Sequence, residues 1–441
     1  VARMAKSVFI DYDFSGNVKT HRLASSVIKS DFRLTYLEAQ ALIDDDKKEA
    51  AKHARADNSY NEQLSQALSQ MDQLSRIIRR RRDLAGMITL DLPEVELVYD
   101  EQGYVIDAQP EDDAYTHKLI EAFMVEANEA VARTFADLNI PAIRRVHPDP
   151  SAHDTQELRR FARVAGYNIP QNPSREELRA LLTATAGKPA ARAVHFAVLR
   201  TLTKAEYSPA LIGHFALASD HYLHFTSPIR RYPDLTAHRQ VQALLEITDS
   251  KSPTKLPTNP GKRKRLGRQL AEDKRCPDEA ALTELGRHCS ARERNAEAAE
   301  RDLRNFLVLQ LLEKYVGDTF EGTITGIMGF GIFVQIDKYL VDGLIKLNDL
   351  PGAPRERWQL NTDTGSVVAQ RSGKTLSLGD RLKVTINKIN LGARQLDLLI
   401  TQHTPQQATQ QSSKNKQSHK PNKQKSKSKN KSTPPKRKRR R

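Results

Sequence analysis

Two adjacent arginines flanked by prolines are the first residues of this sequence whose types and spacing could do chemistry. Arg230 and Arg231 stand between Pro228 and Pro233. Proline interrupts regular structure and is favoured in the first turn of a helix, so the spacing predicts a turn that presents both arginines just before a helix containing Leu235. A guanidinium stays charged at every relevant pH and binds phosphate through two donors, so the pair could grip adjacent phosphates. Composition alone favours the alternative, a cluster of surface ion pairs.

A second candidate is a glycine-rich stretch with two aromatic residues. Phe330 and Phe333 lie within the run from Gly329 to Val334. Stacking of a base on an aromatic ring contributes about 1–3 kcal/mol and tolerates any base. We expect Phe333 to stack on a base rather than fill a core, and both roles stay open for Phe330. Lys346 and Arg394 could add phosphate contacts on the same face, or be ordinary solvated charges.

These residues need helices and strands to position them. Alternating apolar residues from Val8 to Phe14, followed by a Ser-Gly-Asn turn, predict a β-hairpin that returns over residues 18–24. Apolar residues recurring every three or four positions predict helices from about 60 to 82 and from 117 to 135. A composition rich in Ala, Glu, Arg and Leu predicts a third helix over 278–314.

Two further stretches have a different texture. Residues 249–268 mix Ser, Pro, Gly and Lys/Arg with little apolar content, which predicts a surface loop or insertion. Beyond Gly317, short β-prone runs are separated by glycines. Five such strands within about 85 residues predict a small closed barrel of the OB type.

The carboxyl-terminal residues 403–441 carry most of the positive charge. They contain 14 Lys/Arg and no acid, within a chain whose net charge is +16. A segment without large apolar residues cannot bury enough surface to offset its ordering entropy, so we expect it to be disordered. It could contact structured RNA or ribosomes, or act only as a solubilising extension.

Length and composition limit the class of protein. A chain of 441 residues predicts two or more domains. No apolar run approaches a membrane span and no secretory leader is apparent, so we expect a cytoplasmic protein with no membrane partner. Cys276 and Cys289 are too few for a disulfide framework or a four-cysteine zinc site, and we expect ordinary thiols.

The residues from His224 to Leu235 resemble the signature of the ribonuclease II/ribonuclease R family. They read His-Phe-Thr-Ser-Pro-Ile-Arg-Arg-Tyr-Pro-Asp-Leu, and His238-Arg239 follows. Further segments resembling the family occur in the same order across roughly residues 1–400: Arg33–Tyr36, His117–Glu121, Ala127–Ala130, Arg145–His147, His288–Ser290, Glu293-Arg294 and Ala299–Asp302. The barrel resembles the S1 RNA-binding module, and the barrel with its lysine-rich tail is most similar to the ribonuclease R branch.

The resemblance implies a 3′ to 5′ exoribonuclease that hydrolyses RNA to nucleoside 5′-monophosphates. It implies that Arg230 contacts the phosphate near the cleavage point, with Arg231 in support. It places Tyr36 beside the RNA 3′ end and assigns Glu121 to the ribose 2′-hydroxyl, the group that distinguishes RNA from DNA. The family often has a second acid after this glutamate, where this chain has Ala122.

The family's Mg²⁺-binding aspartate motif does not occur in this sequence. Mg²⁺ takes hard oxygen ligands and activates the attacking water. The acidic groups that are present are expected to be structural: Asp11 and Asp13 on the first strand, Asp44–Asp46 between helices, and Asp112-Asp113 before a helix. A first residue other than methionine and a beginning in mid-sheet predict an amino-terminally truncated chain, with the ligating aspartates upstream of Val1.

Together these observations predict an α+β chain in three parts. A partial RNB catalytic domain is expected over residues 1–314, an all-β S1 barrel over 315–402, and a disordered basic tail over 403–441. The predicted partner is the 3′ end of single-stranded RNA, and the predicted cofactor of the family is Mg²⁺. The alternative is a noncatalytic single-stranded RNA-binding protein derived from the same family.

Overall fold

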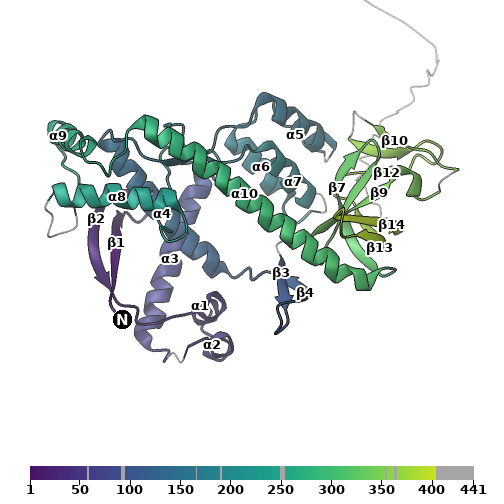
Figure 1. Cartoon of the computed structure of the whole chain (residues 1–441), viewed down its shortest axis with the longest axis horizontal. Coiled ribbons are helices and arrows are strands. Elements are labelled where there is room, and N and C mark those ends of the chain that lie inside the picture. Colours follow the sequence, from purple (N-terminus) through teal and green to yellow (C-terminus); the bar gives the residue numbers. More distant parts are fainter. Residues whose placement is uncertain are drawn as a thin grey trace, which may run out of the picture. The chain divides into compact units, whose positions relative to one another are not determined.

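The computed structural model describes residues 1–56, 59–90, 95–164, 166–188, 191–248, 254–352, 355–361 and 365–403, and Figure 1 shows their arrangement. The mixture of helices and strands confirms the predicted α+β class. The predicted basic tail lies outside the described residues, apart from His403. No helix among the described residues is long and apolar enough to cross a membrane.

The chain begins with the predicted hairpin, formed by β1 (Arg3–Tyr12) and β2 (Val18–Ile28). Asp13 shapes the turn, because its carboxylate accepts hydrogen bonds from the backbone N–H groups of Ser15 and Asn17, both at 2.9 Å. Gly16 has φ of +81°, and a Cβ at this position would approach the Ile77 side chain to 2.6 Å. Only glycine therefore allows the hairpin to lie this close to the following long helix.

Helices α1 to α4 follow the hairpin. Their bounds are α1 (Tyr36–Ile43), α2 (Lys47–His53), α3 (Glu62–Leu84) and α4 (Tyr115–Asp137), so both predicted long helices are confirmed. Thr35 and Glu38 form a capping box that starts α1, and Asn61 caps α3. Val131 and Phe135 of α4 are fully buried, which makes this helix a central element of the core.

Several shorter elements were not predicted from the sequence. They are the hairpin β3 (Val95–Tyr99) and β4 (Val105–Pro110), the pair β5 (Arg144–Val146) and β6 (Glu206–Ser208), and the helices α5 (Ala152–Val164), α6 (Arg175–Thr185) and α7 (Ala191–Thr201). The three helices share a small core that includes Leu158, Leu178 and Val198, and Ile88 and Phe215 from other parts of the chain also belong to it.

The signature segment leads into α8 (Tyr232–Ile247), which is followed by α9 (Pro260–Ala271) and α10 (Glu279–Leu312). A short 3₁₀ turn (Glu313–Tyr315) then ends the helical region. The surface loop predicted over 249–268 is therefore wrong from Pro260 onward. The reason is tertiary, because Leu266 and Leu270 are buried in a core that α4 and α8 also line, and local composition does not reveal this burial.

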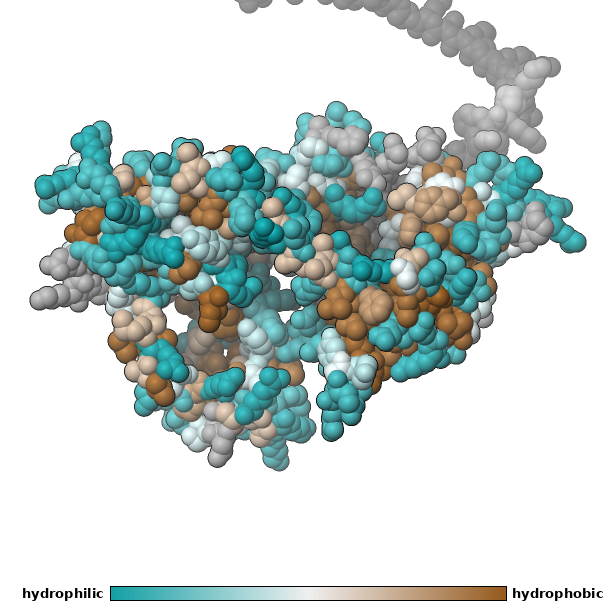
Figure 2. Space-filling view, viewed as in Figure 1, coloured by the Kyte–Doolittle hydropathy of each residue, from teal (hydrophilic) through white to brown (hydrophobic). Residues whose placement is uncertain are grey.

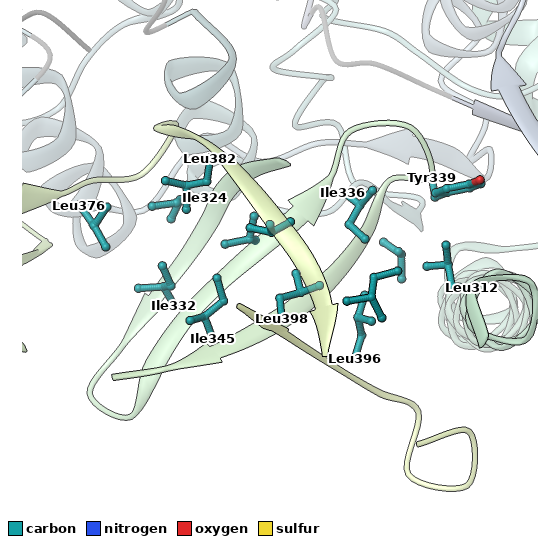
Figure 3. Packing of buried hydrophobic residues seen from close by; sticks show 14 of the residues in the cluster. Leu312, Ile324, Ile332, Ile336, Tyr339, Ile345, Leu376, Leu382, Leu396 and Leu398 are labelled. Atoms are coloured by element: carbon teal, nitrogen blue, oxygen red, sulfur yellow. The ribbon is translucent and has the colours of Figure 1, made fainter. Parts of the chain in front are cut away.

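The predicted five-stranded barrel is confirmed. Strands β7 (Thr319–Met328), β8 (Gly331–Ile336), β9 (Val341–Lys346), β13 (Arg381–Asn390) and β14 (Gln395–His403) close in the order β13-β14-β9-β8-β7. Their apolar side chains point toward one another inside the barrel (Figure 3). A 3₁₀ turn (Leu347–Asp349) and a three-stranded sheet that was not predicted lie between β9 and β13: β10 (Trp358–Asn361), β11 (Ser366–Ala369) and β12 (Thr375–Leu376).

Helix α10 packs its last turn against this barrel. Leu309 and Leu312 are buried in the same cluster as the barrel residues, and Figure 3 shows Leu312 beside the barrel interior. Because the 34 residues of α10 rise about 1.5 Å each, the helix is about 51 Å long. Its first half contacts α8 and β6, so this single helix runs from the helical region to the barrel (Figure 1).

Candidate nucleic-acid interface

The turn that carries Arg230 and Arg231 lies immediately before α8, as predicted. The carbonyl of Ser227 accepts the N–H groups of Arg230 and Arg231 at 3.3 and 3.1 Å. The Asp234 carboxylate is fully buried and accepts the Ser227 N–H and the Arg231 Nη2, both at 2.8 Å. Arg231 therefore locks the turn through an internal ion pair. Arg230 is exposed and makes no ion pair with any described residue.

Two neutral histidines lie close to this turn. Burial and, to a smaller extent, the nearby charges of Arg231, Arg145 and Arg230 together lower the pKa of His224 to about 2. Burial also lowers the pKa of His214 to about 3, with a contribution from His147. The Nδ1 atom of His224 lies 2.9 Å from the Tyr207 hydroxyl. Because both imidazoles stay uncharged at neutral pH, the positive charge of this region belongs to the arginines alone.

The buried phenol of Tyr222 contacts α4 through Asn128, and the charges of Glu121 and Arg231 both influence its pKa. Burial raises the pKa of Tyr222, Arg231 and a hydrogen bond from Asn128 lower it, and Glu121 raises it. The Asn128 Nδ2 donates to the Tyr222 hydroxyl at 3.1 Å. Glu121 is exposed, whereas the neighbouring Ala122 is buried, so of these two positions only Glu121 faces solvent.

Tyr36 reaches the same helix from the start of α1. Its ring stacks on His117 with centroids 3.7 Å apart and planes inclined by 27°. The Thr116 hydroxyl donates to the Tyr36 carbonyl at 2.8 Å, and the Asp112 carboxylate lies 3.1 Å from the Nε2 atom of His117. Tyr36 remains 43% exposed, so ring surface is still available to a ligand.

Helix α4 therefore joins two of the predicted site residues. His117 and Glu121 are four residues apart, which places them on one face of the helix. His117 was not among the residues predicted to form the site. Its spacing from Glu121 was the signal that could have identified it. A groove of about 960 Å³ beside Tyr36 is lined by three cations, Arg33, Lys52 and Arg55, and also by acidic residues, Asp112 among them.

On the barrel, Phe330 and Phe333 form an aromatic pair. Phe330 lies in the turn between β7 and β8 and is 59% exposed. Phe333 alternates along β8 with the buried Ile332 and Val334, so its ring points away from the barrel interior. The two rings lie 6.2 Å apart and are nearly perpendicular at 87°. Gly326 leaves room for this arrangement, because a Cβ there would approach the Phe333 ring to 3.3 Å.

The two predicted cations of the barrel have different surroundings. Lys346 pairs in register with Gly331, next to Phe330, and its Nζ lies 4.0 Å from Asp397. Arg394 lies in the turn before β14 and makes an ion pair of 2.8 Å with Asp302 of α10. The structure thus brings Phe330, Phe333 and Lys346 together. No contact between described residues links Arg394 to them.

The acidic groups have structural partners. Asp11 accepts the Thr20 hydroxyl at 2.5 Å, Asp46 caps α2, and Asp112 contacts His117. Across the described ranges, no group of three or more His, Cys, Asp or Glu side chains is arranged to hold a metal ion. These residues therefore do not fit the ligand set that Mg²⁺ requires. Cys276 and Cys289 are free thiols, as expected.

Comparison with known proteins gives a consistent result. The RNB domain model matches residues 1–247, and the S1 RNA binding domain model matches residues 313–401. Ribonuclease R of Aquifex aeolicus (strain VF5) is 34% identical over 384 residues, which cover 87% of this chain and 50% of that protein. The chain therefore spans about half the length of this curated relative.

Two solved structures extend the comparison to the fold. The apo form of Mycoplasma genitalium RNase R gives a TM-score of 0.76 at 27% identity, covering 91% of this chain and 58% of that one. The same protein in complex with ribose methylated single-stranded RNA gives the same values. The similarity therefore includes a structure that holds RNA.

Proposed function

The chain belongs to the RNB domain family, whose model matches more than half of it, and on this premise we propose that it carries the RNA-gripping part of a ribonuclease R-like 3′ to 5′ exoribonuclease. The proposed reaction is hydrolysis of RNA to nucleoside 5′-monophosphates, and the proposed partner is the 3′ end of single-stranded RNA. Mg²⁺ stays a prediction from the family, because the described residues do not supply its ligands.

One observation carries this proposal. Tyr36 stacks on His117 of α4, Glu121 lies one turn further along this helix, and Asn128 of the same helix accepts the backbone N–H of Phe225, in the segment that leads to the arginine turn. An aromatic ring, a carboxylate and an arginine turn are thus held in one neighbourhood although they are up to 195 positions apart in the sequence. These are the three types of group needed to hold a base, a ribose hydroxyl and a phosphate.

Arg230 is proposed to clamp the phosphate near the scissile bond. Its backbone is held by Ser227, and the buried Arg231–Asp234 pair fixes the turn before RNA arrives. A preorganised cation stabilises negative charge that develops during the reaction without further reorganisation. The neutral state of His224 leaves this charge to the arginines.

Glu121 and Tyr36 are proposed to recognise the terminal nucleotide. An exposed carboxylate can accept a hydrogen bond from a 2′-hydroxyl, which DNA lacks. The Tyr36 ring is held by His117, and its exposed surface can stack on a base. Phe330 and Phe333 of the barrel are proposed to stack on bases further along the strand in a sequence-independent way.

Binding of fluorescent single-stranded RNA and DNA to the purified chain tests the recognition part. Glu121→Ala should reduce the preference for RNA over DNA and leave DNA affinity unchanged. Arg230→Ala should weaken both. Arg239→Ala is the matched control, because it removes one exposed charge from α8, where Arg239 contacts Tyr232. Equal losses in Arg230→Ala and Arg239→Ala would indicate only a general loss of positive charge, and an unchanged preference for RNA in Glu121→Ala would contradict the assignment of Glu121.

Activity tests the reaction itself. Because the described residues hold no carboxylate cluster, the purified chain should bind RNA but release no labelled mononucleotide in Mg²⁺ above a denatured control. In a form of the protein that also carries the family's aspartate motif, Arg230→Ala should lower turnover far more than RNA affinity. Equal losses of both would indicate a folding or general binding role for Arg230.

A further inference from the structure

Helix α9 carries a dense set of positive charges that the proposed site does not use. Its twelve residues include five cations and no acid: Lys262, Arg263, Lys264, Arg265 and Arg268. The buried side of the helix consists of Leu266, Gly267 and Leu270. Figure 2 shows hydrophilic side chains covering the position of α9 at the upper left of the molecule.

Three of these cations lie on the side opposite the buried stripe. At 100° per residue, Lys264, Arg265 and Arg268 cluster around the direction opposite to Leu266 and Leu270. All three are exposed and make no ion pair with any residue that the structure describes. Arg263, by contrast, is held by the Pro257 carbonyl at 2.6 Å and lies 3.9 Å from Asp137.

This arrangement opposes the stability of the helix itself. Lys264 and Arg268 are four residues apart and Arg265 and Arg268 are three apart, and like charges at these spacings repel. Lys262 lies in the first turn, where the helix dipole favours acidic residues and none is present. Because the charges are locally unfavourable, their placement calls for a role outside the helix.

Tertiary packing nevertheless holds α9 in place. A Cβ at Gly267 would lie 2.2 Å from the Leu138 carbonyl, so the backbone of α9 packs directly on the end of α4. Asn259 caps the helix by accepting the Lys262 N–H at 3.2 Å. The outward cations therefore project from a fixed element that shares its core with the helix carrying Glu121.

We propose that the outward face of α9, formed by Lys264, Arg265 and Arg268, is a second phosphate-binding surface that contacts RNA independently of sequence. This inference rests on the proposed function, since it assigns a further contact to the same substrate. Phosphates along a strand require only correctly placed cations. A membrane-binding helix needs an outward apolar face and a protein interface needs aromatic or aliphatic anchors, whereas the large apolar residues of α9 are all buried.

The test uses the full chain and compares two variants of equal charge. Lys264→Gln/Arg265→Gln/Arg268→Gln removes the outward face of α9. Its matched control, Arg287→Gln/Arg292→Gln/Arg301→Gln, removes three exposed arginines from α10, where acids such as Glu284 and Glu300 alternate with them. Affinity for a fluorescent 20-nucleotide single-stranded RNA is measured from 50 to 300 mM salt.

The expected result is a smaller salt dependence for the α9 variant only. Each lost phosphate contact makes the slope of log affinity against log salt shallower by about 0.7. At 0.1 M salt this corresponds to a loss of affinity of roughly fivefold for each contact. Three contacts should therefore lower the slope by about 2. Unchanged slopes, or equal reductions in both variants, would overturn the inference and leave the proposed function intact. Failure of the unmodified chain to bind RNA would overturn both.

A second measurement does not depend on the folding of the charge variant. A photo-crosslinking amino acid replaces the exposed Gln269 beside the cationic face, and labelled RNA should crosslink there in the otherwise native chain. Absence of this crosslink while the chain binds RNA would overturn the inference. Binding to vesicles containing phosphatidylserine tests a membrane as the alternative partner. If the α9 variant lost vesicle binding but kept the RNA binding of the unmodified chain, the surface would be assigned to a membrane instead.

Discussion

The two neutral histidines near the arginine turn should make the helical part of this protein sensitive to acid. His214 and His224 have pKa values lowered to about 3 and about 2, mainly by burial and further by nearby positive charge. An unfolded histidine has a pKa of about 6.5. Between pH 6.5 and these lowered values the unfolded chain binds more protons than the native one, so stability falls as pH falls.

The magnitude follows from this difference. Each pH unit below 6.5 costs about 1.4 kcal/mol of unfolding free energy for each ring that stays neutral in the native state. From pH 7 to pH 5 the loss is about 2 kcal/mol for His224, and a similar loss applies to His214. Since small domains are stable by about 5–15 kcal/mol, the two rings together account for a substantial part of the total.

Urea unfolding at pH 7 and pH 5 measures this effect. The His224→Asn variant keeps a polar atom near the position of Nδ1, where it can still contact Tyr207, but its side chain cannot titrate. Between pH 7 and pH 5 its free energy of unfolding should therefore fall by about 2 kcal/mol less than that of the unmodified chain. Circular dichroism at 222 nm follows the helices. Trp358, the single tryptophan, reports on the barrel, and no histidine occurs between residues 313 and 402.

A surface histidine provides the control. His288→Asn alters an exposed ring on α10 and should keep the full acid sensitivity of the unmodified chain. If His224→Asn also kept the full loss between pH 7 and pH 5, His224 would not be neutral in the native state, and the description of the charge around the arginine turn would be incorrect.

Four other changes give separate outcomes. Phe333→Ala should weaken single-stranded RNA binding by about 1–3 kcal/mol at every salt concentration without changing the salt slope, and unfolding of the barrel by circular dichroism would show instead that the ring is core. Residues 404–441 contain all 14 cations of the tail, and their deletion should make the affinity for single-stranded RNA less dependent on salt while the preference for RNA over DNA stays unchanged. An unaltered salt slope would indicate that the tail has a solubilising role. Asp234→Ala leaves the partly buried Arg231 unpaired and should cost about 3–5 kcal/mol of unfolding free energy, and a loss below about 1 kcal/mol in urea unfolding would show that the pair does not hold the turn. His117→Ala should weaken RNA binding by about 0.5–1.5 kcal/mol by releasing the ring it supports, and His117→Phe should restore it in the same anisotropy assay.

Local patterns in the sequence were sufficient for much of the fold. The period of apolar residues predicted α3 and α4, a composition rich in Ala, Glu, Arg and Leu predicted α10, and the glycine-punctuated β-prone runs predicted the closed barrel. The prolines around Arg230 predicted a turn before α8. These features depend on residues a few positions apart, because backbone hydrogen bonding and side-chain alternation act over that range.

Tertiary structure alone decided how the site is assembled. Composition predicted a loop where α9 forms, because the burial of Leu266 and Leu270 depends on distant elements of the chain. Likewise, the sequence did not reveal the ion pair of Arg394 with Asp302, because Asp302 lies on a different element, α10. The stack of Tyr36 on His117 joins residues 81 positions apart. Such contacts depend on packing between elements, which no local period in the sequence records.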